Sequence, residues 1–383
     1  MATNFPLDRF REIQTPFYYY DMELLKATLN EINVCCNGMP YKVHYAVKAN
    51  ANNNILQCIQ SSGLGVDCVS GGEVEAAVKA GFDGKKIVFA GVGKTDSEIN
   101  YALDTDILCF NVESVPELEV INELAARKGK IADVAFRVNP NVDAHTHKYI
   151  TTGLNENKFG INIEQLPDVL NLAANLKHVH VIGLHFHIGS QITDMEPFVR
   201  LCEKINNLQA EVSKNGVELK IINVGGGLGV DYDNPDGNPI PVFKEYFEVF
   251  KKHLYLRDGQ EVHFELGRSV VAQCGSLITR VTYVKTGTVK RFVITDAGMT
   301  DLIRPALYQA HHKIENISSD EKDTSVYDIV GPICESSDCF GENELLPITR
   351  RGDLLALRTA GAYGEIMASQ YNLRRLPGVL YSE

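Results

Sequence analysis

Between residues 23 and 268, short apolar segments alternate with amphipathic ones, and this alternation limits the possible folds more than any other feature of the chain. In the amphipathic segments 73–80 and 115–128, apolar side chains recur about every 3.6 residues, as in a helix. Strands that alternate with helices normally form a parallel sheet. Eight such strands favour a closed (β/α)₈ barrel over an open doubly wound sheet. The predicted strands are 42–49, 65–70, 86–90, 107–112, 133–138, 179–187, 220–224 and 261–265.

The pattern changes near residue 270. Four later segments (276–287, 290–298, 326–331 and 353–361) alternate with Gly, Asp and Pro, which is typical of antiparallel β structure. The only helix expected in this region is 366–371. We therefore expect an α/β barrel domain at 23–270 and a mostly antiparallel β domain, a sandwich or a small barrel, at 271–383.

Composition excludes several classes of function. The net charge is −12 and there is no basic block, which argues against nucleic acid and against an anionic membrane as partners. The N-terminal segment carries the charged residues Asp8, Arg9, Arg11 and Glu12, where a secretory signal would need an apolar run. The nine cysteines are irregularly spaced without a C-x-x-C pair, so neither disulfides nor a metal site is indicated. We expect a cytoplasmic protein without a metal.

Several residues with chemical potential lie at the carboxyl ends of predicted barrel strands, where barrels place their active sites. Lys48 follows an apolar strand in YAVKAN, and desolvation there favours a neutral, nucleophilic amine. The glycines 225–227 leave backbone N–H groups available for an oxyanion. Each feature also has an ordinary explanation, namely a solvated lysine and a tight turn.

Two further strand ends carry ionisable residues. His187 in HFHIGS is a candidate for ring stacking or acid–base chemistry, whereas a regular strand would turn His185 to the opposite face, so the two should not both serve. Glu265 in ELGR suits a proton on a heteroaromatic nitrogen, but an ion pair with Arg268 is an equally good explanation.

In the β region three clusters stand out: 296–308 (DAGMTDLIRPALY), 331–338 (GPICESSD) and 361–364 (GAYG). Taken singly, they are also explained by a bulge and turn, a buried Cys334 and a glycine-flanked turn.

Taken together and in order, these motifs resemble the fold-type III pyridoxal-phosphate-dependent decarboxylases, and within them the branch that acts on diaminopimelate. The resemblance runs from TPFYYYD at 15–21 to GAYGEIMASQYN at 361–372. It implies an alanine-racemase-like barrel plus a β domain that residues 1–22 join, and a homodimer with shared active sites. One departure is Leu266, where the family usually has proline; Glu265, Gly267 and Arg268 are kept.

The resemblance also assigns roles to residues. Lys48 corresponds to the Schiff-base lysine, and Glu265 to the group that keeps the pyridine nitrogen protonated. The other cofactor-binding positions are His187, Ser190, Gly226, Gly227, Gly267, Arg268 and Tyr363. The substrate-binding positions are Arg268, Arg304, Tyr308, Glu335 and Tyr363. Cys334, supplied with Glu335 by the other subunit, corresponds to a proton donor.

The activity implied by the resemblance is decarboxylation of meso-2,6-diaminopimelate to L-lysine and CO₂, the last step of lysine biosynthesis, with pyridoxal 5'-phosphate as cofactor. Three alternatives remain open. An ornithine- or arginine-type decarboxylase would need no Arg304, a racemase of this fold would have an arginine in place of Glu265, and a catalytically silent, regulatory homologue would not need Lys48, Glu265, Cys334 and Tyr363 together.

Overall fold

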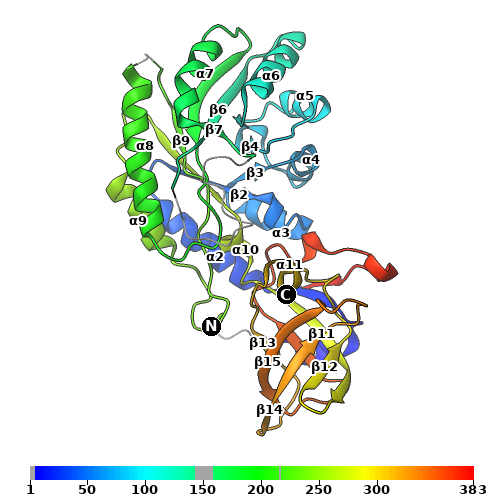
Figure 1. Ribbon diagram of the computed structural model, residues 1–383. Helices are drawn as coiled ribbons and strands as arrows, with labels where there is room; N and C mark the ends of the chain where they lie inside the picture. The colour runs from blue at the N-terminus through cyan, green and yellow to red at the C-terminus, as the bar shows by residue number, and fades with distance from the viewer. Residues whose placement is uncertain (1–4, 143–157, 215–216) are drawn as a thin grey trace. The chain divides into compact units, whose positions relative to one another are not determined.

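A computed structural model describes residues 5–142, 158–214 and 217–383. Contacts within the chain divide it into two compact units (Figure 1). The first, here called the barrel unit, consists of Leu29–Gly229 and Val242–Gly267. The second, the β unit, consists of the residues up to Thr28, the segment Val230–Pro241 and Arg268–Glu383. The boundaries expected from the sequence left Val230–Pro241 in the barrel region, whereas its contacts group it with the β unit.

The described strands of the barrel unit pair in parallel and close into a ring. The strands are β2 (Tyr41–Ala46), β3 (Gly65–Cys68), β4 (Ile87–Phe89), β5 (Cys109–Val112), β6 (Ala132–Asn139), β7 (Ile161–Asn162), β8 (Val179–His185), β9 (Ile221–Asn223) and β10 (Glu261–Leu266). Pairing runs in the order β5, β4, β3, β2, β10, β9, β8, β6, and β6 pairs again with β5, while the short β7 lies beside β6. The predicted (β/α)₈ barrel is confirmed, and each predicted strand overlaps one of these.

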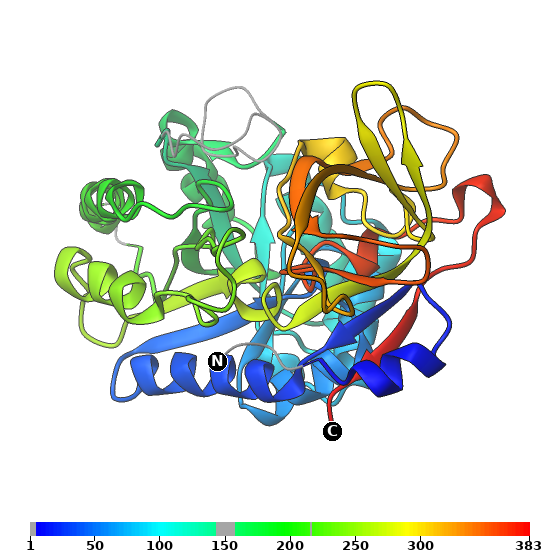
Figure 2. The same cartoon turned by 90° about the horizontal axis from the view of Figure 1, so that it is seen from below.

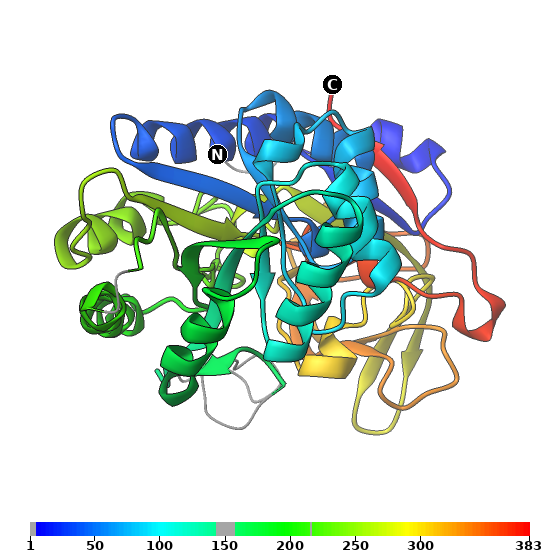
Figure 3. The ribbon, with the colours of Figure 1, turned by 90° about the horizontal axis from the view of Figure 1, so that it is seen from above.

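Helices cover the outside of the ring (Figure 3). They are α2 (Met22–Cys36, which begins in the β unit), α3 (Asn53–Ser61), α4 (Gly71–Lys79), α5 (Asp96–Asp104), α6 (Val115–Arg127), α7 (Leu166–Ala173), α8 (Glu196–Lys214) and α9 (Phe243–His253). Local sequence sets their starts. Before α5, the Thr95 hydroxyl accepts from the Glu98 N–H and the Glu98 carboxylate accepts from the Thr95 N–H, a capping box. Among the described residues, no helix is long and apolar enough to cross a membrane.

Alternation along β10 decides which side chains enter the barrel. Phe264 packs outward against the rings of Phe247 and Phe250 on α9, with centroids 4.9 and 5.1 Å apart. Neighbouring residues in a strand point to opposite faces, so Glu265 points into the interior. The same alternation therefore buries an aromatic layer under α9 and delivers a carboxylate to the carboxyl end of the barrel.

The β unit is a mostly antiparallel sheet, as predicted (Figure 2). Its strands are β1 (Phe17–Tyr20), β11 (Gly275–Thr286), β12 (Arg291–Thr295), β13 (Ile314–Asn316), β14 (Thr324–Val330), β15 (Cys339–Pro347), β16 (Leu354–Leu357) and β17 (Gly378–Tyr381). They pair in the order β13, β16, β11, β12, β14, β15, and β1 joins β11 to β17. The β12–β14 and β1–β17 pairs are parallel.

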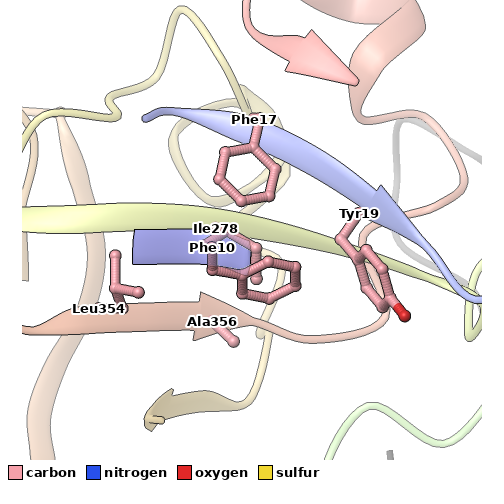
Figure 4. Packing of buried hydrophobic residues seen from close by; sticks show 6 residues of the cluster. All are labelled: Phe10, Phe17, Tyr19, Ile278, Leu354 and Ala356. Carbon is pink, nitrogen blue, oxygen red and sulfur yellow. The ribbon is translucent and has the colours of Figure 1, made fainter. Parts of the chain in front are cut away.

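The N-terminal segment contributes to the core of this unit (Figure 4). Phe10 on α1 (Leu7–Glu12) is fully buried, and its ring lies 5.1 Å from that of Phe17 and 5.0 Å from that of Tyr19. Phe17 and Tyr19 are two residues apart on β1, so they share one face of the sheet with Ile278 on β11. Each fully buried aromatic side chain of this kind contributes roughly 1.5–3 kcal/mol to folding.

The helix predicted at 366–371 is wrong. The chain there forms two short 3₁₀ turns, Glu365–Met367 and Tyr371–Leu373, separated by the extended Ala368. Ala368 has a φ of −63° and a ψ of 149°, an extended conformation that interrupts any helix through this segment. The helices that do form are α10 (Arg268–Val271) and the missed α11 (Arg304–Tyr308), which has Pro305 in its first turn.

Candidate active site

Glu265 lies at the centre of a buried polar network inside the barrel. Its Oε1 accepts hydrogen bonds from Asn111 Nδ2 on β5 at 3.0 Å and from Asn223 Nδ2 on β9 at 2.7 Å. Its Oε2 lies 2.9 Å from Nε2 of His185, the last residue of β8. Three strands thus fix one carboxylate, and every one of these partners is itself buried.

The network keeps Glu265 charged. Burial alone would raise its pKa, but the charge and hydrogen bond of His185 outweigh this and hold the pKa well below its usual range. A carboxylate accepts and never donates, so Nε2 of His185 carries a proton. The result is a fixed, ionised acceptor in a buried site, where charges act most strongly.

Lys48 lies two residues beyond the end of β2, on the 3₁₀ turn Val47–Ala49 and not on the strand itself. The end of β10 approaches this turn closely, because a Cβ on Gly267 would lie 3.1 Å from the Ala46 Cβ and 3.2 Å from the Ala49 Cβ. The buried Asp67 on β3 lies in the same electrostatic neighbourhood: burial and the charge of Glu265 raise its pKa, and Lys48 lowers it. Lys48 itself is exposed.

The glycine loop after β9 needs its glycines. Gly225 and Gly227 have φ values of +71° and +108°, and a Cβ on Gly226 would come within 1.9 Å of the Glu265 carbonyl oxygen. The loop that carries Ser190 lies beside it, since the Ile192 N–H donates to the Gly227 carbonyl at 2.9 Å. Two loops of backbone therefore meet at one end of the barrel, an arrangement that suits a phosphate.

His187 faces this glycine loop, with the Gly226 N–H donating to its Nδ1 at 3.4 Å. Burial and the charge of Lys48 hold the pKa of His187 well below 6.5, so the ring is neutral. The expectation that His185 would turn away from the site is wrong. The strand ends at His185, so the alternation on which that expectation rested does not extend to His187, and His185 is the residue that holds Glu265.

The β unit holds a second cluster, built around two arginines. Arg268 and Arg304 are only 7% and 6% exposed. Both donate to the hydroxyl of Tyr232, at 2.6 and 2.9 Å. The guanidinium carbon of Arg268 lies 4.9 Å from the ring centroid of Tyr363, a cation–π distance. Tyr363 has a φ of 56°, in a turn flanked by Gly361 and Gly364.

The remaining predicted residues also lie in the β unit. Tyr308 ends α11, which begins with Arg304, and is half-buried. Cys334 and Glu335 follow β14 and are exposed, so Cys334 is not the buried hydrophobe of the alternative explanation. The Glu335 carboxylate accepts from the Tyr371 hydroxyl at 2.6 Å.

Sequence reasoning missed Asn111, Asn223 and Tyr232. It also missed the buried His312, whose Nε2 lies 2.9 Å from Arg304 Nη1. A signal existed for the two asparagines, because each is a polar residue inside an otherwise apolar strand. None existed for Tyr232, which lies in a loop noted only for its turn residues.

The barrel cluster fits pyridoxal phosphate. A buried carboxylate that stays ionised suits a protonated pyridine nitrogen, a lysine is available for covalent attachment, and the glycine loop offers backbone donors.

A family model described as the pyridoxal-binding domain of pyridoxal-dependent decarboxylases matches residues 24–272. A diaminopimelate decarboxylase from Bacteroides thetaiotaomicron is 61% identical over 374 residues, 97% of each chain. Diaminopimelate decarboxylase from Helicobacter pylori, solved with L-lysine, superposes with a TM-score of 0.93 at 40% identity, over 98% of this chain and 94% of that one. The M. jannaschii enzyme, also solved with L-lysine, gives a TM-score of 0.91 at 37% identity, over 98% and 89%. The fold, the barrel cluster and these similarities agree: the chain belongs to the pyridoxal-phosphate-dependent decarboxylases, in the diaminopimelate decarboxylase family.

Proposed function

We propose that this protein decarboxylates meso-2,6-diaminopimelate to L-lysine and CO₂, using pyridoxal 5'-phosphate, as the last step of lysine biosynthesis. The observation that carries the choice of substrate is Arg304. It is almost fully buried, and neither of the hydrogen-bond partners found for it among the described residues, Tyr232 and His312, is a carboxylate. A buried guanidinium without an anion is costly, so it suits a substrate that brings a carboxylate.

The barrel residues prepare the reacting end of the substrate. The cofactor, when bound, accepts the electron pair left by the departing CO₂. We assign its covalent attachment to Lys48 and the proton on its ring nitrogen to Glu265. His187 would stack on its ring, and Ser190, Gly226, Gly227 and Gly267 would hold its remaining groups. Arg268 and Tyr363, which belong to the β unit, keep the cofactor-binding role that the family resemblance gives them.

The other assigned residues select the substrate and complete the reaction. Arg268, Arg304 and Tyr308 bind the distal carboxylate, for which a planar guanidinium offers two parallel N–H donors. Glu335 and Tyr363 contact the substrate. Cys334 delivers a proton to the carbon that has lost CO₂, which gives L-lysine. Water then returns a proton to the thiolate.

Each alternative function leaves Arg304 or Glu265 without a role. Ornithine and arginine have no second carboxylate, so an enzyme for them gains nothing from Arg304. A silent regulatory homologue would have no need for an ionised Glu265 together with Lys48. Both alternatives therefore leave buried charges unexplained.

The test is CO₂ release from a panel of substrates: the three diaminopimelate isomers, ornithine, arginine and lysine. We expect release from meso-diaminopimelate with kcat/KM at least about 10³-fold above that of ornithine or arginine, because a site built for a charged group rejects a ligand that lacks it. Preference for ornithine or arginine would replace the proposal, and release from none of the six would favour the silent homologue.

We further propose that the protein works in the cytoplasm as a homodimer whose two active sites are shared. Cys334 and Glu335 are exposed in the single chain, although their proposed roles require a site closed to water. Leu373, on the turn next to Tyr371 and Glu335, is 96% exposed. Both features are explained if a second copy covers this surface and accepts these residues into its site.

Mixing two inactive variants tests the shared site. Lys48→Ala and Cys334→Ala, each inactive alone, should regain about a quarter of wild-type activity after random subunit exchange, because half of the dimers are then mixed and each mixed dimer has one intact site. The measurement is CO₂ release before and after exchange, with exchange followed by a mass tag on one variant.

A Lys48→Ala protein mixed with Glu265→Ala is the matched control. Both lesions lie in the barrel, so no combination of these subunits restores an intact site and no activity should return. If exchange is demonstrated and Lys48→Ala with Cys334→Ala also stays inactive, each site is built within one chain.

A further inference from the structure

We propose that Tyr232 is a positioning residue that holds Arg268 and Arg304 ready for the distal carboxylate of the substrate. This inference rests on the proposed function and adds to it a residue that selects dicarboxylic substrates. All the residues involved belong to the β unit.

The hydroxyl of Tyr232 lies between two positive charges. It accepts from Arg268 Nη1 at 2.6 Å and from Arg304 Nη1 at 2.9 Å, which uses both lone pairs of a phenolic oxygen. The Arg304 guanidinium carbon also lies 5.0 Å from the centroid of the Tyr232 ring. One neutral side chain thus keeps two like charges together, although burial and the charge of Arg268 both lower the pKa of Arg304.

His312 supplies a second fixed point for Arg304. Its Nδ1 lies 2.9 Å from the Arg358 carbonyl oxygen and must donate to it, which leaves the Nε2 lone pair to accept from Arg304 Nη1 at 2.9 Å. Burial and the charge of Arg304 lower the pKa of His312 to about 3, so the ring stays a neutral acceptor at physiological pH. Both hydrogens of Arg304 Nη1 are therefore directed at neutral acceptors, and this fixes the plane of the guanidinium.

The loop that carries Tyr232 is held in place by the same part of the unit. Arg358 Nη2 contacts Asp236 Oδ1 at 2.8 Å, and the Arg358 side chain is only 4% exposed. Within the loop, Asp231 Oδ1 accepts from the backbone N–H groups of Asp233 and Asn234 at 2.9 and 2.8 Å. Arg358 thus anchors the loop through its side chain and His312 through its carbonyl, so Tyr232 and His312 share one support.

This arrangement explains why Val230–Pro241 leaves the barrel region of the sequence to pack in the β unit. The segment brings one hydroxyl to two arginines that lie 36 residues apart in the chain (268 and 304). Donors that are already held in place lose little conformational entropy when the substrate binds. More of the interaction with the distal carboxylate therefore contributes to affinity.

The experiment uses the holoenzyme and two ligands that differ in one group. L-lysine keeps the distal carboxylate, and 1,5-diaminopentane is the same molecule without it. In Tyr232→Phe the aromatic ring remains but the hydroxyl is lost. We expect the Kd for L-lysine and the KM for meso-diaminopimelate to rise about tenfold, the Kd for 1,5-diaminopentane to stay within twofold, and kcat to change less than KM.

Tyr327→Phe is the matched control. Its side chain is also buried in the β unit, where the hydroxyl accepts from the Thr349 N–H at 3.3 Å and not from Arg268 or Arg304. That variant should leave both Kd values and KM unchanged. His312→Leu, which removes the other acceptor of Arg304, should reproduce the loss for L-lysine alone and provides a second test if Tyr232→Phe folds poorly.

The outcomes distinguish a failure of the proposed function from a failure of the positioning role of Tyr232. If the wild-type holoenzyme neither binds L-lysine nor releases CO₂ from diaminopimelate, the proposed function fails. If the wild type does both, but Tyr232→Phe weakens the two ligands equally or neither of them, the function stands and Tyr232 has no positioning role.

Discussion

Replacing Lys48 with alanine is expected to lower the decarboxylation rate by roughly 10³-fold or more. The amine lies on the turn directly after β2, where the end of β10 and the glycine position 267 bring the chain close. No other group is assigned the covalent attachment of the cofactor. The variant should therefore also lose the visible absorption of the covalently bound cofactor, and borohydride reduction followed by peptide mapping should label Lys48 in the wild type.

Lys42→Ala is the control for this change. Lys42 lies on the same strand, is exposed, and pairs with Glu261 at 3.6 Å, a surface contact worth about 0–1 kcal/mol. It should leave rate and absorption unchanged. A borohydride label on any lysine other than Lys48, or a Lys48→Ala enzyme with wild-type rate, would remove Lys48 from the proposed mechanism.

The barrel could be predicted from the sequence because apolar residues recur with different periods in its strands and its helices. In the structure these segments form the strands β2 to β10 and the helices outside them. Register and strand ends were less predictable. Lys48 and His187 each lie two residues beyond the end of a strand that was predicted to include them, since β2 ends at Ala46 and β8 at His185. An apolar run does not show where backbone pairing stops, and side-chain direction depends on that point.

The network around Glu265 could not be assembled from the sequence for a different reason. Asn111 and Asn223 lie 154 and 42 residues from Glu265 in the chain and meet it only because the ring of strands closes. Tyr232 illustrates the same limit in the β unit, because nothing in a turn-rich loop shows which unit it will join. Local periodicity predicts elements; contacts between distant polar residues depend on closure and packing.

Replacing Glu265 with glutamine is expected to lower kcat by about 10²–10³-fold, the size of effect seen when one preorganised charge or donor is removed from a reacting centre. Glutamine keeps the shape of the side chain but not its charge, so it cannot hold a proton on the ring nitrogen of the cofactor. The carboxylate is well suited to that task, because His185 keeps its pKa low despite full burial.

The change should not unfold the barrel. The glutamine carbonyl still accepts from Asn111 and Asn223, and its NH₂ group then faces Nε2 of His185. Nε2 of His185 can accept from this NH₂ group when it carries no proton, and the ring then has its hydrogen on Nδ1, an atom that is buried without a hydrogen-bond partner among the described residues. The cost is then at most the unfavourable burial of one rearranged polar pair, about 1–3 kcal/mol, and the thermal midpoint should fall by only a few degrees.

Two measurements distinguish a lost charge from a damaged site. The visible spectrum of Glu265→Gln should still show covalently bound cofactor, because Lys48 is intact, while single-turnover CO₂ release from meso-diaminopimelate becomes slow. Glu261→Gln removes a carboxylate from the other end of the same strand and should leave both unchanged. A Glu265→Gln enzyme that keeps its cofactor and releases CO₂ within twofold of the wild-type rate would show that the charge of Glu265 is not needed, and the role of the buried network would then be to support the barrel alone.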